Sequence, residues 1–180
     1  MNKYVITGGP GVGKTSVVDA LARRGCLVVP EAARMVIEEE QEKHRRDNSY
    51  EPIVPTTHLA EFQHLCMDRI LQLESRVDQD CFLDRCLVDN IAYAKTGKVP
   101  SPQSIYRHIN RAGYTKVFFL QQLGMYVKDD VRKEDPQFAS RVHWSIYDTY
   151  VTMGYPMMVV PAVPVEERVR LILANLTEDF

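Results

Sequence analysis

The segment from Gly8 to Thr15, GGPGVGKT, contains the residue types needed to hold a phosphate. Glycines let the backbone fold around an anion, so that successive N–H groups point inward. In a G-x-x-x-x-G-K-T motif the lysine, here Lys14, lies against the β- and γ-phosphates, and the threonine, here Thr15, is a Mg²⁺ ligand. An apolar run precedes this loop and a helical pattern follows it, which is the context that the motif requires. The residues predicted to bind the phosphates of ATP are Gly8, Gly9, Pro10, Gly11, Val12, Gly13, Lys14, Thr15 and Ser16.

The elements that must position this loop alternate along the chain. Strands are predicted at 4–7, 26–29, 81–84, 116–120 and 157–160, and helices at about 13–24, 57–77, 88–96, 101–113, 137–153 and 164–176. Alternating strands and helices predict a parallel sheet with helices on both faces, a three-layer α/β/α fold in one domain over residues 1–180. Ligands in such folds bind beyond the carboxyl ends of the strands, so the residues after each strand are the next candidates.

Two strands are followed by an acid and an arginine. After the second strand come Glu31 and Arg34; Glu31 is either a group that orients or deprotonates an acceptor hydroxyl, or an acid in the first turn of a helix. After the third strand come Asp84 and Arg85. The position of Asp84 favours a Mg²⁺-holding acid over a surface-turn acid, and Arg85 suits an anionic substrate group.

Two further segments leave alternatives open. The charged stretch 126–141 is either a lid over the phosphates or a solvated helix, and its cations are Lys128, Arg132, Lys133 and Arg141. Gln63 falls within the apolar stripe of the 57–77 helix, so its amide pairs either with a nucleobase edge or with a backbone group across the core. His143 and Trp144 mark either a pocket or ordinary core packing.

Composition limits the classes of partner. The chain has 180 residues, 45% hydrophobic, 26% charged, with a net charge of −2. This balance argues against a nucleic-acid binder, and no run approaches the roughly 18 apolar residues of a membrane span. We expect a cytoplasmic protein whose four cysteines are buried, reduced thiols.

Several segments together resemble the AAA-type P-loop ATPase/kinase family that includes the ribosylnicotinamide kinase domain. They are VITGGPGVGKTS, VVPEAAR, FQ, FLDRCLVDNIAYA, VFFL, the R-x-E…VH pattern and GYPMMVVPAVPVEERVRLIL. The resemblance runs almost end to end and implies a nucleotide-kinase-like sheet with strand order 2-3-1-4-5. Members of the family include kinases and proteins described only as ATPases, and one relative is described as a GTP-binding trafficking protein.

A more distant resemblance is to the deoxynucleoside kinases. It implies that Glu31 is the base, that Phe62 and Gln63 read the nucleobase, and that Asp84-Arg85 is the acid–arginine pair. The lid pattern of those kinases corresponds here to Arg132, Glu134 and Val142-His143. The chain departs from them in having Asp-Arg-Cys for Glu-Arg-Ser, in placing Pro30 before Glu31, and in carrying Arg69 one residue out of register.

These observations predict a phosphotransferase that moves the γ-phosphoryl of ATP·Mg²⁺ to a small nucleoside- or nucleotide-like acceptor. Lys14, Glu31, Asp84 and Arg132 are the expected catalytic residues, with Thr15 and Asp84 holding Mg²⁺. The expected substrate-binding residues are Glu31, Arg34, Phe62 and Gln63, on substrate-side helices at about 31–78, and Arg85 after the third strand. Arg132 and Arg141 are expected to close over the nucleotide from a lid at about 124–142. The alternative is a nucleotide-dependent switch with slow hydrolysis. The chain lacks an N-K-x-D guanine-reading motif, which favours ATP over GTP.

Overall fold

A computed structural model describes residues 1–123 and 136–176. The strands are β1 (Lys3–Thr7), β2 (Val28–Val29), β3 (Cys81–Asp84), β4 (Tyr114–Leu120) and β5 (Met157–Val160). The helices are α1 (Lys14–Arg23), α2 (Ala32–Arg46), α3 (Leu59–Glu74), α4 (Leu87–Thr96), α5 (Ile105–Ala112), α6 (Pro136–Thr152) and α7 (Val165–Ala174). Most of the predicted segments are present, but β2 is shorter than the apolar run at 26–29. The Cys26 N–H bonds to the Leu21 carbonyl and closes the turn after α1 instead of joining the sheet.

The five strands form one parallel sheet in the order β2-β3-β1-β4-β5, which confirms the predicted fold and strand order. The central strand β1 pairs with β3 on one side, where Ile6 lies opposite Asp84, and with β4 on the other. The P-loop that follows β1 therefore begins beside the end of β3.

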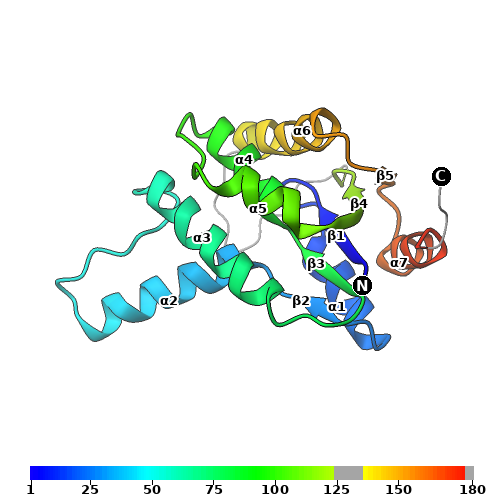
Figure 1. Ribbon diagram of the computed structural model, residues 1–180, viewed down its shortest axis with the longest axis horizontal. Helices are drawn as coiled ribbons and strands as arrows, with labels where there is room; N and C mark the ends of the chain where they lie inside the picture. Colours follow the sequence, from blue (N-terminus) through cyan, green and yellow to red (C-terminus); the bar gives the residue numbers. More distant parts are fainter. Residues whose placement is uncertain (124–135, 177–180) are drawn as a thin grey trace.

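Alternating side chains divide the apolar core between the two faces of the sheet. Val5, Leu83 and Phe119 point into a cluster under α3, α4, α5 and α6. Ile6, Phe82 and Phe118, each next to one of these in sequence, point into a second cluster under α1 and α7. This period of two is what a sheet covered on both faces requires. Figure 1 shows α4, α5 and α6 on one side of the sheet and α1 and α7 on the other.

Helices α2 and α3 lie side by side and extend away from the sheet as an arm (Figure 1). A small third cluster holds them together, with Val36 from α2 packed against Phe62 and Cys66 from α3. The base of the arm, where α2 begins, lies directly after β2. Within the described residues, no helix is long and apolar enough to cross a membrane.

Candidate active site

Three strand ends bring the predicted site residues to one edge of the sheet. The P-loop follows β1, Arg85 follows β3, and Pro30-Glu31 follow β2. Because β2, β3 and β1 are consecutive neighbours, the phosphate loop and the two acid–arginine segments lie in a row. The predicted site residues thus share the carboxyl edge of the sheet, where ligands bind in open parallel sheets.

The P-loop leads into α1 with the geometry of an anion site. Gly13, the residue before α1, has φ of +83°, a conformation that costs glycine little, and no side chain caps the helix. The first N–H groups of α1 are therefore available to an anion, which the helix dipole also attracts. Lys14 is buried, and its Nζ donates to the carbonyls of Gly8 (3.3 Å) and Gly9 (3.0 Å).

His143 on α6 supports the start of the P-loop. Its Nδ1 accepts a hydrogen bond from the Gly9 N–H at 3.0 Å. The approach is so close that a Cβ added to Gly9 would lie 2.7 Å from the Cβ of His143, so only glycine fits there. Burial, with the nearby Lys14 charge, lowers the pKa of His143 to about 4. The imidazole is therefore neutral near pH 7, and Nδ1 is an acceptor.

Asp84 ends β3 and is the carboxylate next to the P-loop. It is buried, and it lies level with Ile6 in β1, one residue before Thr7. Within the described part of the chain, no group of three or more His, Cys, Asp and Glu side chains could hold a metal ion on its own. A single buried carboxylate at this position, Asp84, fits Mg²⁺, which binds through one or two carboxylates together with substrate phosphates and water.

Glu31 and Arg85 form a buried ion pair across the ends of β2 and β3. The Nε of Arg85 donates to Oε1 of Glu31 at 3.0 Å, and Nη1 donates to Oδ1 of Asp89 at 3.0 Å. Both carboxylates and the guanidinium are less than a tenth exposed. Burial acts to lower the pKa of Arg85, but Tyr93 and the surrounding carboxylates outweigh burial and raise it well above its usual value. The guanidinium is thus a fixed cation.

The backbone of Arg85 is also unusual, with φ of +70° in the left-handed region. A bulky residue adopts this conformation only where its surroundings enforce it, and such residues are frequent at functional sites. Here the Arg85 N–H bonds to the Ile6 carbonyl and the side chain is held by two carboxylates. Strand pairing and the ion pairs together hold Arg85 in this conformation.

Asp89 on α4 links these parts and was not among the predicted site residues. Its carboxylate accepts four hydrogen bonds, from the hydroxyls of Thr7 (2.5 Å) and Tyr150 (2.7 Å), the Cys86 N–H (3.1 Å) and Arg85. It therefore joins the end of β1, the start of α4, Arg85 and α6. A signal was available in the sequence, since an acid three residues after the N-cap position, here Cys86, suggests a capping box.

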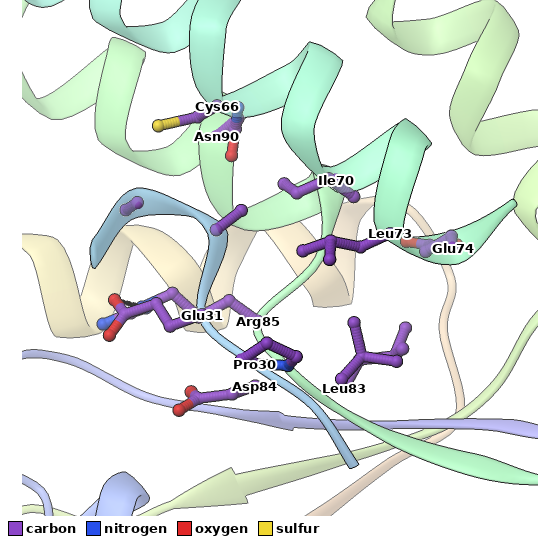
Figure 2. A pocket seen from close by; sticks show the side chains of 13 residues that line it. Pro30, Glu31, Cys66, Ile70, Leu73, Glu74, Leu83, Asp84, Arg85 and Asn90 are labelled. Carbon is purple, nitrogen blue, oxygen red and sulfur yellow. Dashed lines mark hydrogen bonds and ion pairs between the residues drawn. The ribbon is translucent and has the colours of Figure 1, made fainter. Parts of the chain in front are cut away.

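A small cavity of about 30 Å³ lies behind the Glu31–Arg85 pair. Figure 2 shows the carboxylates of Glu31 and Asp84 on one side of this cavity, while Ile70, Leu73 and Leu83 form its apolar wall. The volume is that of one or two water molecules. In this structure the space beside the ion pair therefore has room for water but not for a substrate.

Comparison with known proteins places the chain in a family. A model of the family described as an AAA domain matches residues 3–168, which is most of the chain. The chain belongs to this AAA-domain family. Among curated proteins, no sequence matches it significantly.

Solved structures of a deoxyadenosine kinase and of NadR share the fold of this AAA-domain chain. Deoxyadenosine kinase from M. mycoides with the products dCMP and dCDP has a TM-score of 0.66 at 16% identity, over 97% of each chain. The same kinase with bound dATP has a TM-score of 0.63 at 14% identity, over 99% of this chain and 100% of that one. NadR in complex with NR has a TM-score of 0.59 at 17% identity, over 88% of this chain and 45% of that one. At these identities the likeness shows the fold alone.

The other residues predicted to bind the acceptor lie on α2 and α3 of the arm. Phe62 is buried in the cluster between α2 and α3, and Gln63 is 3% exposed. Asn90 on α4 donates to the Gln63 carbonyl at 3.2 Å, and within residues 1–123 and 136–176 the Gln63 side-chain amide bonds to no other residue. Arg34 is half-buried on α2, with no ion pair inside the described ranges. That these residues bind the acceptor remains a prediction.

The predicted lid is described only at its end. Arg132, Glu134, Lys128 and Lys133 lie outside the described residues. Arg141 is on α6, exposed, with its guanidinium 5.8 Å from the centre of the Phe138 ring. Arg69, the arginine out of register, pairs with Glu39 through two hydrogen bonds of 2.6 Å on the arm.

Proposed function

We propose that this AAA-domain protein is an ATP-dependent kinase that phosphorylates a hydroxyl group of a neutral, nucleoside-like acceptor. The fold and the P-loop support nucleotide binding, and the deoxyadenosine kinase from M. mycoides, which has the same fold, has been solved with dCMP, dCDP and dATP. The more specific claim, a neutral acceptor, depends on the charges next to the P-loop.

The observation that carries the proposal is the engagement of Arg85 by two carboxylates. Glu31 and Asp89 each accept a hydrogen bond from it, and Asp84 is its neighbour in sequence. An arginine that grips a phosphate uses a pair of its N–H groups on that anion. Here two of the three guanidinium nitrogens already bond to carboxylates, and three acids surround one cation. The three carboxylates around Arg85 therefore repel a phosphorylated acceptor and admit a neutral polyol.

The proposed reaction assigns a step to each residue. The acceptor oxygen forms a bond to the γ-phosphorus of ATP while the bond between that phosphorus and the β–γ bridging oxygen breaks, releasing ADP. Glu31 accepts the hydroxyl proton or orients the hydroxyl. Lys14 offsets the charge on the transferred phosphoryl group, and Thr15 and Asp84 would hold Mg²⁺, which would neutralise charge on the phosphates. Arg85 holds Glu31 in place.

The experiment that tests the proposal is an assay of ATP consumption with Mg²⁺, with the mass of the product as the readout. The purified protein is incubated with ATP alone, with a pool of nucleosides, and with the matching pool of nucleoside monophosphates. We expect a product one phosphoryl group heavier from the nucleoside pool only. Transfer to the monophosphates would overturn the neutral-acceptor argument. Slow ATP hydrolysis whose rate is the same with and without either pool would favour the nucleotide-dependent switch.

A further inference from the structure

Arg168 on α7 is a buried arginine directed at the P-loop from outside the predicted site. It is 2% exposed and is one of the largest fully buried side chains in the described structure. Its Nη1 donates to the Val12 carbonyl at 2.6 Å, and Nη2 lies 3.4 Å from the Gln121 carbonyl after β4. Both acceptors belong to loops at the carboxyl edge of the sheet.

No carboxylate neutralises this cation within residues 1–123 and 136–176. The Nε atom is buried and makes no hydrogen bond there, and burial lowers the pKa of Arg168. By contrast, Arg170 on the same helix is exposed, with Glu167 at 3.9 Å. A charge buried without a counter-ion costs folding free energy, and a well-packed apolar side chain of similar size would avoid that cost. Packing alone therefore does not explain an arginine here.

The contact with Val12 determines the direction of the next peptide N–H. In a trans peptide the carbonyl and the following N–H point in opposite directions. Because Arg168 holds the Val12 carbonyl, the Gly13 N–H points away from Arg168. The guanidinium is close to the backbone here, because a Cβ added to Gly13 would lie 3.6 Å from Nη1. Arg168 thus both orients a P-loop amide and places a positive charge beside the loop.

We infer that Arg168 is a positioning residue and a fixed charge for the polyphosphate of the nucleotide. It acts through the P-loop backbone, with no need to touch the nucleotide. The inference rests on the proposed function only in taking a nucleoside triphosphate as the ligand of the P-loop. Its contribution to affinity grows with the number of phosphates on the ligand and is absent for a nucleoside, because both the amide and the charge act on anions.

The test compares Arg168→Met, Arg168→Lys and the control Arg170→Met by isothermal titration calorimetry. Arg170→Met removes the same charge from an exposed position two residues away on α7. The probes are inorganic tripolyphosphate, ATP and adenosine, and thermal unfolding without ligand is measured in parallel. We expect Arg168→Met to weaken tripolyphosphate and ATP binding at least tenfold and adenosine binding less than twofold. Arg170→Met should change the affinity for each of the three probes less than twofold.

The lysine variant keeps the charge but contacts one carbonyl at most. We expect its tripolyphosphate affinity to lie between those of the wild type and Arg168→Met, and it serves as the test if the methionine variant does not fold. Unchanged tripolyphosphate affinity in both variants, or an equal loss for adenosine, would overturn the inference. Tripolyphosphate binding that depends on Arg168 in a protein that phosphorylates no nucleoside would support the inference while refuting the kinase. A wild-type protein that binds neither tripolyphosphate nor ATP would refute both.

Discussion

Replacing Asp89 by asparagine tests whether its carboxylate, which accepts four hydrogen bonds, holds β1, Arg85, α4 and α6 together. The substitution preserves the shape of the side chain, removes its charge and turns one acceptor oxygen into an NH₂ group. That NH₂ group cannot face Arg85, which itself only donates. Because Arg85 is a charged donor and the Cys86 N–H a neutral one, the NH₂ group is expected in the place of Oδ2, the atom that accepts from the Cys86 N–H and the Tyr150 hydroxyl.

The magnitude follows from the bonds that are lost. The Tyr150 hydroxyl can rotate and accept from the new NH₂ group, but the Cys86 N–H is left buried without an acceptor, at about 1–3 kcal/mol. Removing one partner of a buried ion pair costs about 3–5 kcal/mol, and Glu31 still pairs with Arg85, so the lower part of that range applies. Together these two costs lead us to expect that Asp89→Asn lowers the free energy of unfolding by about 4 kcal/mol.

The assay is urea unfolding followed by far-ultraviolet circular dichroism, extrapolated linearly to water. The matched control is Asp148→Asn, the same change at an exposed position on α6, for which we expect less than about 0.5 kcal/mol. A loss below 1 kcal/mol in Asp89→Asn would refute the reasoning, because the carboxylate would then not be holding its four donors. A double-mutant cycle with Tyr150→Phe should show coupling of about 1 kcal/mol.

The remaining predictions concern the P-loop, the acceptor side and pH. Lys14→Ala should lose at least about 2 kcal/mol of transition-state stabilisation, measured as a fall in kcat/KM for ATP of about thirtyfold or more. Glu31→Gln should reduce kcat more than it changes ATP affinity by calorimetry, since Glu31 lies on the acceptor side. The pKa of His143 falls from 6.5 to about 4 on folding, so the unfolded chain binds its proton first on acidification. The free energy of unfolding should therefore fall as pH drops from 6.5 towards 4, by up to about 2 kcal/mol at pH 5. The variant His143→Asn keeps an acceptor oxygen but does not titrate, so its free energy of unfolding should not show this part of the fall.

Each of these has a contrary outcome. Unchanged turnover in Lys14→Ala would end the proposed mechanism. An effect of Glu31→Gln on ATP affinity alone would make Glu31 a binding or structural residue. Equal acid sensitivity of the wild type and His143→Asn between pH 7.5 and pH 5 would show that His143 is not kept neutral by the fold.

The fold was predictable because its signals are local. Apolar runs such as 81–84 and 116–120 are too short for helices, and glycines at the ends of helices, such as Gly113, mark their stops. The P-loop and the residues after the second and third strands were found by the same means, since strand ends in a parallel sheet share one edge. The exception, β2, was overestimated because Cys26 is as apolar as a strand residue but bonds within the preceding turn.

The partners of the site residues were not predictable, because they come from helices distant in sequence. Asp89, His143 and Arg168 meet the P-loop or Arg85 only after α4, α6 and α7 have packed on the sheet. Arg168 did carry a signal, since it falls on the inward face of the last helix between Val165 and Ile172. A charged residue at such a position indicates a specific acceptor, but the sequence does not say which one.

The central place of β1 has a consequence for synthesis of the chain. Lys3 pairs with Cys81 on one side and with Tyr114 on the other, so β1 leaves the ribosome well before either of its sheet partners. Loop closure over such separations slows folding, and an unpaired apolar strand is open to wrong association meanwhile. We expect nascent chains that end before β4 to need chaperone protection, with the phosphate loop among the last parts to take shape.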